Sequence, residues 1–280
     1  MGNMKKAVSS ITHLATCLDP ASFARYSVGV FLNSRTILRE RSLRSADEVM
    51  RGRKVRCRIM KKAVTVDGDL IGGVREIYSD KVYFLLPGFD IHPSDVVVDL
   101  GANVGMFTLL AALKGRKVVA VEAQAGYLPQ IKRYAAANGC AEKVAVEWGL
   151  VGGGTGVFAD PAELDRVCGG RRDLPPNLSI DQIMERHGLD RIDFLKCDIE
   201  GSEYDLLRQD GAMAWLQRTD KIAMEVHPAF GDTQAMKRVL EDHGFDVRMV
   251  DRQWDLTDAI VDDTGFVFAK NTRWHSICDV

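Results

Sequence analysis

The stretch V-V-V-D-L-G-A-N-V-G, residues 96–105, decides the fold of this chain. Three β-branched residues lead into Asp99, and the glycine-containing segment that follows precedes residues 106–113, which have a helical composition. This order predicts a buried strand, a tight turn and the start of a helix. In open α/β sheets, nucleotide-like ligands bind at the carboxyl edge of such a strand.

Strands and helices alternate from Asp95 onward, as is typical of a parallel sheet with crossover helices. The expected strands are 96–100, 117–122, 143–148, 192–197, 221–226, 245–250 and 265–269. The expected helices are 104–114, a helix ending at 138, 179–187, 202–209, and one from 232 or 233 to 243. Residues 149–178 are rich in glycine and interrupt this order, so we expect a long loop that contacts the substrate.

The chain before this alternation has a different pattern. Residues 1–45 are expected to be helical, with Asp19 as an N-cap and Pro20 at the first helical position. From Lys54 apolar residues alternate with basic ones, and Asp67-Gly68 is a hairpin signal, so residues 54–92 are expected to form a small antiparallel β region. The sequence therefore predicts two domains. An N-terminal appendage, 1–92, caps the substrate or contacts a second subunit in a homodimer, and a catalytic domain occupies 93–280.

The composition is that of a soluble globular protein, with 46% apolar and 27% charged residues. No apolar run approaches the ~18 residues of a membrane-spanning helix, so no membrane partner is expected. Six scattered cysteines without a C-x-x-C pair indicate a reducing compartment, and we expect a cytoplasmic protein.

The formal net charge of −2 gives no general reason to expect a nucleic-acid partner, but the charge is uneven. The basic region, residues 35–62, holds eleven Lys or Arg and three acids. Such a run is a solvated surface or a docking surface for an acidic substrate, a carrier protein or nucleic acid.

The glycine turn does not suit a dinucleotide. The dinucleotide fingerprint places glycine at three positions that are Gly101, Asn103 and Met106 here, so two of the three fail. The carboxylate of Asp99 at this edge would also repel a pyrophosphate. A cationic ligand without phosphate, such as S-adenosylmethionine, fits both observations.

Glu122 ends the next strand, 21 residues after Gly101. An acid at this place accepts hydrogen bonds from the two ribose hydroxyls of a bound nucleoside. This feature is common to sites for NAD and for S-adenosylmethionine, so it supports a ribose without choosing between the two cofactors.

Four motifs resemble the FkbM family of S-adenosylmethionine-dependent methyltransferases. They are V-V-V-D-L-G-A-N-V-G-M-F-T, V-V-A-V-E-A, L-S-I-D-Q-I with I-D-F-L-K-C-D-I-E-G-S-E, and I-A-M-E-V-H-P. The resemblance implies a class I methyltransferase fold, which is a Rossmann-like α/β architecture with a seven-stranded sheet and helices on both faces. It also implies methylation of oxygen on secondary metabolites or sugars. The chain departs from the family pattern after the third strand, at residues 148–151.

Acids and a histidine follow the fourth and fifth strands. Asp198 and Glu200 end the fourth strand, and Glu225 and His227 end the fifth. Such groups can hold the donor's methionine part, orient an acceptor hydroxyl or take its proton, and His227 has an ordinary pKa suited to a base near neutral pH. The same four residues could hold a hard cation, but the prediction includes no metal.

We therefore predict an S-adenosylmethionine-dependent methyltransferase, most simply an O-methyltransferase acting on a small-molecule hydroxyl by in-line attack on the sulfonium methyl. The predicted catalytic residues are Asp198, Glu200 and His227. The predicted cofactor-binding residues are Glu76, Asp99, Gly101, Asn103, Gly105, Glu122 and Asp198. Two alternatives stay open: a nicotinamide-dependent oxidoreductase, and a non-catalytic binding module that uses the basic region.

Overall fold

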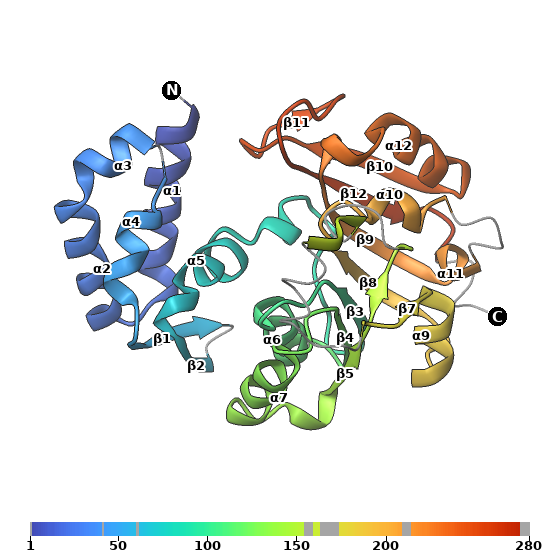
Figure 1. Ribbon diagram of the computed structural model, residues 1–280, viewed down its shortest axis with the longest axis horizontal. Coiled ribbons are helices and arrows are strands. Elements are labelled where there is room, and N and C mark those ends of the chain that lie inside the picture. Colours follow the sequence, from blue (N-terminus) through green and yellow to red (C-terminus); the bar gives the residue numbers. More distant parts are fainter. Residues whose placement is uncertain are drawn as a thin grey trace. The chain divides into compact units, whose positions relative to one another are not determined.

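The computed structural model of the chain describes residues 2–40, 42–59, 62–153, 159–162, 174–208 and 214–274, with side chains from residue 9 onward (Figure 1). The chain divides into two compact units, Met1–Val82 and Tyr83–Val280. The sequence-based boundary lay ten residues later, after residue 92. The role of the first part as a cap or a dimer contact stays a prediction.

The first unit begins with helices. They are α1 (Gly2–Cys17), α2 (Pro20–Leu32), α3 (Ser34–Glu40) and α4 (Arg44–Asp47). The predicted cap is confirmed, because the Asp19 carboxylate accepts hydrogen bonds from the backbone N–H groups of Ala21 and Ser22, at 3.0 and 3.3 Å, and Pro20 opens α2.

A hairpin of β1 (Lys54–Ile59) and β2 (Lys62–Asp67) follows, but its turn is not at Asp67-Gly68. Gly68 instead opens the 3-10 helix η2 (Gly68–Leu70), and a Cβ there would lie 1.9 Å from the carbonyl oxygen of Met50. This glycine permits a close backbone approach rather than a hairpin turn, so that prediction was wrong.

The antiparallel β region expected up to residue 92 is also wrong beyond β2. The chain there forms α5 (Ile71–Gly73), the π-helix η3 (Val74–Asp80) and the 3-10 helix η4 (Val82–Phe84). Val74 and Tyr78 are both buried and four residues apart, which is a helical spacing.

The basic region contributes one exposed face of the hairpin. Lys54, Arg56 and Arg58 are exposed and alternate with buried apolar residues of β1. Whether this face binds a partner stays a prediction.

The second unit contains an eight-stranded sheet in the order β11-β10-β12-β9-β8-β3-β4-β5. Its strands are β3 (Val96–Leu100), β4 (Lys117–Glu122), β5 (Val144–Trp148), β8 (Ile192–Cys197), β9 (Thr219–Val226), β10 (Phe245–Val250), β11 (Leu256–Thr257) and β12 (Gly265–Asn271). Strands β5, β4, β3, β8 and β9 are parallel, and β12 lies antiparallel between β9 and β10. This confirms the class I methyltransferase fold, and the two-residue β11 adds an eighth strand to the predicted seven.

Helices cover both faces of this sheet. They are α6 (Met106–Lys114), α7 (Leu128–Ala137), α9 (Ile180–His187), α10 (Glu203–Leu206), α11 (Ala214–Gln217) and α12 (Thr233–Asp242) with the 3-10 helices η5 (Ala141–Lys143) and η7 (Pro228–Phe230). Val119 and Val121 of β4 pack in one core with α9 to α12, whereas Ala120 packs with Ile131 of α7 on the other face. This alternation follows from the two-residue period of a strand.

The segment 149–178 is described only in part. Its two ends pair as the short parallel strands β6 (Leu150–Val151) and β7 (Asn177–Leu178). Residues 154–158 and 163–173 of the expected substrate loop lie outside the described residues. Across the described residues, every helix is too short or too polar to cross a membrane.

Candidate active site

The turn Gly101–Gly105 joins the ends of three neighbouring strands. Gly101 has φ +70°, and a Cβ on it would lie 1.7 Å from the carbonyl oxygen of Asp198, at the end of β8. The N–H groups of Gly101 and Ala102 both donate to the carbonyl of Val121 on β4, at 3.0 Å. Only glycine permits this approach, so the predicted importance of Gly101 has a steric cause.

Gly105 has a related role at the start of α6. It adopts φ +85° as the N-cap residue, and a Cβ there would lie 3.0 Å from the side chain of Ile131 on α7. Gly105 therefore packs helix α6 against α7 and does not line the pocket described next.

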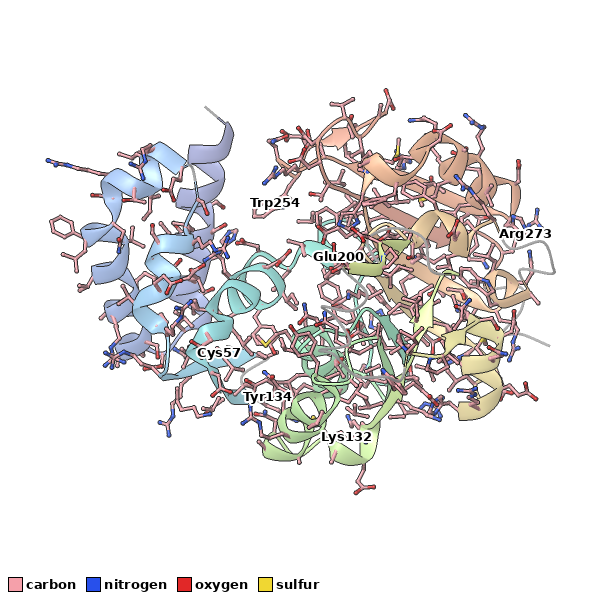
Figure 2. The ribbon with its side chains drawn as sticks, in the orientation of Figure 1. Cys57, Lys132, Tyr134, Glu200, Trp254 and Arg273 are labelled. Atoms are coloured by element: carbon pink, nitrogen blue, oxygen red, sulfur yellow. The ribbon has the colours of Figure 1, made fainter. Side chains whose placement is uncertain are left out.

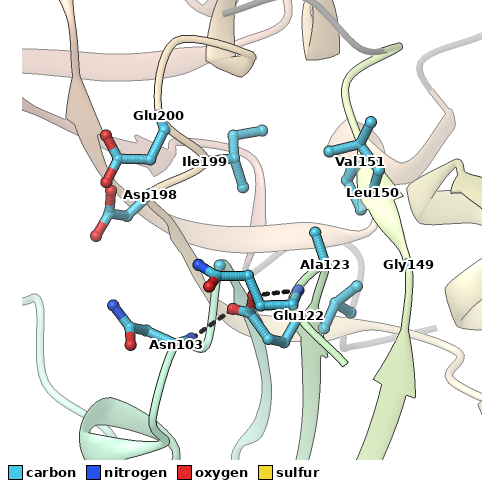
Figure 3. Close-up of a pocket in the computed structure, with 12 residues that line it drawn as sticks. Asn103, Glu122, Ala123, Gly149, Leu150, Val151, Asp198, Ile199 and Glu200 are labelled. Carbon is cyan, nitrogen blue, oxygen red and sulfur yellow. Dashed lines mark hydrogen bonds between the residues drawn. The ribbon is translucent and has the colours of Figure 1, made fainter. Parts of the chain in front are cut away.

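A pocket of about 520 Å³ opens at the carboxyl ends of β3, β4 and β8 (Figure 3). The described residues that line it are Gly101, Asn103, Val121, Glu122, Ala123, Gln124, Gly149, Leu150, Val151, Asp198, Ile199 and Glu200. The structure thus brings together five predicted site residues: Gly101, Asn103, Glu122, Asp198 and Glu200.

The polar and apolar lining residues lie on different sides of the pocket. Figure 3 shows Asp198 and Glu200 on one side, Leu150 and Val151 on the other, and Glu122 at the floor between them. A ligand with a cationic end, a central diol and a flat apolar end matches this order.

Glu122 is held rigidly. Its two carboxylate oxygens accept the backbone N–H groups of Asn103 and Gln124, each at 2.6 Å. Its side chain is buried, and burial raises the pKa of this carboxyl although the two hydrogen bonds lower it. Each oxygen retains a second lone pair, so the group can still accept hydroxyl donors from the pocket.

Asp99 is not at the pocket surface, in contrast to the predicted direct contact with the cofactor. Its carboxylate is fully buried, accepts the Thr108 hydroxyl at 2.6 Å and lies 3.2 Å from Nζ of Lys196. The reason is that its strand position faces the α6 side of the sheet. The Asp99 charge is compensated by Lys196 and cannot itself select a cationic ligand.

Lys196 connects this buried pair to the turn. Nζ donates to the carbonyl oxygens of Leu100 and Gly101, at 3.1 and 2.7 Å, and lies 3.8 Å from the Asp198 carboxylate. Burial alone would lower the pKa of this lysine, but the adjacent Asp99 and Asp198 raise it. Lys196 is thus paired with two acids and also holds the Gly101 turn.

Asp198 has a partner that the sequence reading did not place in the site. The Tyr83 hydroxyl donates to Oδ2 of Asp198 at 3.1 Å and lies 3.4 Å from Oε2 of Glu225. The Tyr83 ring also packs edge-on against Phe107 and lies under Lys196 Nζ. Its position just before the turn motif gave only a weak signal, because the contact depends on the tertiary fold.

His227 lies beside the acids but is not suited to be a base. Its Nδ1 is 3.3 Å from Oε1 of Glu203 and its Nε2 is 3.6 Å from Oε2 of Glu200. Burial lowers the pKa of His227, but the hydrogen bond to Glu203 and the charges of Glu203, Asp198 and Glu200 raise it to about 9. The ordinary pKa therefore does not apply to His227, and the raised pKa favours the protonated ring at neutral pH, which disfavours its predicted role as a base.

Two further predictions concern groups outside this pocket. Glu76 lies in η3 of the first unit, so its role at the cofactor stays a prediction. A search of the described residues finds no cluster of three His, Cys, Asp or Glu side chains that could hold a metal ion.

Comparison with known proteins places this fold in a family. The model of the FkbM methyltransferase domain matches residues 99–247, which is more than half of the chain. The chain belongs to the FkbM methyltransferase family. Membership confirms the resemblance seen in the four motifs and the predicted cofactor, S-adenosylmethionine.

Two curated relatives of this FkbM-family chain share parts of its sequence. The AMB antimetabolite synthetase AmbE of Pseudomonas aeruginosa is 29% identical, over 62% of this chain and 10% of that protein. The 31-O-demethyl-FK506 methyltransferase FkbM of Streptomyces tacrolimicus is 52% identical over 40 residues, which are 14% of this chain and 15% of that enzyme. The chain thus spans only a small part of either relative.

Solved structures with similar folds are more distant in sequence. Precorrin-6y C5,15-methyltransferase from Geobacter metallireducens has 14% identity and a TM-score of 0.41, over 69% of this chain and 89% of that one. A Streptococcus mutans protein in complex with SAH has 11% identity and a TM-score of 0.40, over 64% and 89% of the two chains.

Glu122→Gln is expected to weaken binding of S-adenosylhomocysteine about 10- to 100-fold, the effect of losing one or two charge-assisted hydrogen bonds. The side-chain NH2 of the glutamine would also face one of the two backbone N–H groups that now donate to the carboxylate, so one of those hydrogen bonds would be lost. Isothermal titration calorimetry measures the change. Glu147→Gln on the adjacent strand β5 is the matched control and should bind like the unmodified chain, since Glu147 is not among the described lining residues. Equal affinities for both variants would contradict the role of Glu122.

His227 is expected to make folding stability depend on alkaline pH. Its folded pKa of about 9 lies above the ordinary value of 6.5, so the folded state binds this proton more tightly. The stabilisation is complete below pH 6.5 and is lost as the pH rises through 9, by up to about 3 kcal/mol. Urea unfolding across this range should show that decline in the unmodified chain and a flatter curve for His227→Gln. Parallel curves would exclude the assigned charge state.

Proposed function

We propose that this chain transfers a methyl group from S-adenosylmethionine to a hydroxyl oxygen of a small molecule, such as a secondary metabolite. The observation that carries the proposal is the charge of the pocket. Its described lining contains three carboxylates, Glu122, Asp198 and Glu200, and neither lysine nor arginine. Lys132 on α7, for example, lies well away from Glu200 (Figure 2). A pyrophosphate would be repelled here, whereas a sulfonium and an ammonium group would be attracted.

The lining residues suggest which part of the donor each would hold. Glu122 would accept the ribose hydroxyls, because its carboxylate ends β4 and faces the pocket floor. Leu150 and Val151 would cover the adenine ring with apolar surface. Asp198, fixed by the Tyr83 hydroxyl, would pair with the ammonium group of the methionine part.

When bound, S-adenosylmethionine supplies an electrophilic methyl carbon, which bonds to the acceptor oxygen as the carbon–sulfur bond breaks. The protein must position the hydroxyl in line with that bond, exclude water and accept the hydroxyl proton. Glu200 is the pocket carboxylate best suited to the proton. Its side chain is 58% exposed, which gives the proton a route to solvent. Partial burial and the charge of Asp198 raise its pKa above the ordinary value, although His227 lowers it.

A carboxylate base favours oxygen over nitrogen as the acceptor. A hydroxyl is a weak nucleophile until its proton is being removed, whereas a neutral amine attacks through a lone pair and can lose its proton later.

The alternative function, a nicotinamide-dependent oxidoreductase, is disfavoured by the acidic pocket, because NAD carries a pyrophosphate. The binding-module alternative, based on the basic region 35–62, would be excluded by turnover.

Transfer of labelled methyl from S-adenosylmethionine to a panel of hydroxylated small molecules, with amine analogues of the same skeletons, tests the proposal. We expect turnover with at least one hydroxyl acceptor and a loss of about 100- to 10,000-fold in Glu200→Gln, with binding of S-adenosylhomocysteine retained. Glu147→Gln is again the control and should retain full activity. Turnover confined to amines, or an active Glu200→Gln enzyme, would overturn the oxygen assignment.

A further inference from the structure

A fully buried acid, Glu203 of α10, lies beside the acidic pocket without lining it. Its Oε1 accepts the backbone N–H of Ile199 at 3.0 Å and lies 3.3 Å from Nδ1 of His227. Its Oε2 is buried and has no hydrogen-bond partner among the described residues. A buried carboxylate of this kind needs a compensating cation, and His227 is the group in place to supply it.

Both ring nitrogens of His227 face a carboxylate. Nδ1 faces Glu203, and Nε2 lies 3.6 Å from Oε2 of Glu200. Nδ1 is within hydrogen-bond distance of Glu203, and Nε2 is within ion-pair distance of Glu200, so the two acids together favour the doubly protonated ring, an imidazolium. The charged groups that face it are Glu203 from α10, with Glu200 and Asp198 from the turn after β8, and all three raise its pKa.

Glu200 is the member of this chain of contacts that reaches the pocket. Its backbone is left-handed, with φ +54°, a conformation that costs free energy for a residue with a side chain. Burial and Asp198 raise the pKa of its carboxyl, and His227 lowers it. The positive charge of the imidazolium therefore offsets part of the rise in the Glu200 pKa that burial and Asp198 cause, and so favours the ionised carboxylate.

We propose that Glu203 and His227 are positioning residues, which hold the Glu200 carboxylate ionised and oriented at the pocket so that it can take the acceptor's proton. This inference rests on the proposed function. His227 keeps its proton throughout: the hydroxyl proton passes to a Glu200 oxygen and from there to solvent. The arrangement differs from a catalytic triad, in which the histidine itself receives the proton.

The test is a carboxyl-carbon NMR titration of Glu200 in the full chain. His227→Gln removes a cation 3.6 Å from Glu200 and should raise the Glu200 pKa by about one pH unit. His187→Gln is the matched control. His187 has 17% side-chain exposure against 15% for His227 and is also paired with a glutamate, Glu147 at 2.9 Å, but it lies at the end of α9.

A second variant keeps the test decisive if His227→Gln does not fold. Glu203→Gln preserves size and removes the buried charge, so the ring-proton titration of His227 should move from about 9 toward 6.5. With an acceptor in hand, kcat should fall in both variants while the affinity for S-adenosylhomocysteine changes less than about threefold. A purely structural role would not move these titrations.

The outcomes separate the inference from the proposed function. Unchanged titration of Glu200 in His227→Gln, or of His227 in Glu203→Gln, would overturn the positioning role even in an active methyltransferase. Absence of methyl transfer to every hydroxyl, with the titrations shifted as expected, would instead overturn the proposed function and leave the electrostatic coupling established.

Discussion

Gly101→Ala is expected to weaken binding of S-adenosylhomocysteine by at least about 100-fold. The added Cβ would lie 1.7 Å from the carbonyl oxygen of Asp198, so β3 and β8 must separate at the pocket. A misplacement of about 1 Å can cost two orders of magnitude in the rate at a positioned site, and we expect a loss of similar size in affinity here. Calorimetric titration of the folded variant measures the loss.

Gly188→Ala isolates the contribution of backbone conformation. Gly188 has φ +58°, close to the φ +70° of Gly101, but nothing lies within 4 Å of a Cβ built on it. This control should lose about 1 kcal/mol of stability from backbone strain alone and keep full affinity. Similar behaviour of the two variants would show that the contact with Asp198 does not shape the pocket.

Lys196→Met is expected to lower the free energy of unfolding by about 3–5 kcal/mol, because it leaves the buried carboxylate of Asp99 without its cation. It also removes the donor to the carbonyls of Leu100 and Gly101, so affinity for S-adenosylhomocysteine should fall as well. Urea unfolding and calorimetric titration measure the two effects.

Lys221→Met is the matched control for Lys196→Met. Lys221 is also buried, on β9, and contacts the Asp90 carbonyl at 2.9 Å and the Asp95 carboxylate at 3.5 Å. Asp95 precedes β3, so this pair lies at the opposite end of the strands from the pocket. Lys221→Met should lose stability and retain affinity.

The double variant that combines Lys196→Met with Asp99→Asn should recover part of the stability lost in Lys196→Met. Failure to recover any would contradict the ion-pair assignment.

The strands of the main sheet could be predicted because their signals are local. Residues 96–100, 117–122, 192–197 and 245–250 form strands with the predicted bounds. The first three are short runs of buried residues, as burial on both faces of a sheet demands, whereas 245–250 alternates buried and exposed residues, as an outer strand with one solvated face does. The alternation with helices then implied the parallel order.

The first unit was predicted less well, because a glycine that suggested a hairpin turn and a short alternating run that suggested a strand have different structural roles there. Gly68 was read as a hairpin residue, but it accommodates the backbone of Met50. Val82 lies in a 3-10 helix and not in a strand. Sequence periodicity over three or four residues does not distinguish a short strand from a tight helical turn.

At the site, residue types were predicted better than their roles. Glu122, Asp198 and Glu200 line the pocket as expected, because the ends of parallel strands meet at one edge. The roles of Asp99 and His227 depend on partners distant in sequence, Lys196 and Glu203. An ordinary pKa taken from a model peptide cannot include such partners.

The central claim is that the pocket at the ends of β3, β4 and β8 is the S-adenosylmethionine site, and calorimetric titration of the full chain tests it most directly. S-adenosylhomocysteine should bind with one-to-one stoichiometry, its affinity should fall in Glu122→Gln but not in Glu147→Gln, and NAD should give no heat of binding. Binding of NAD without binding of S-adenosylhomocysteine would contradict the claim.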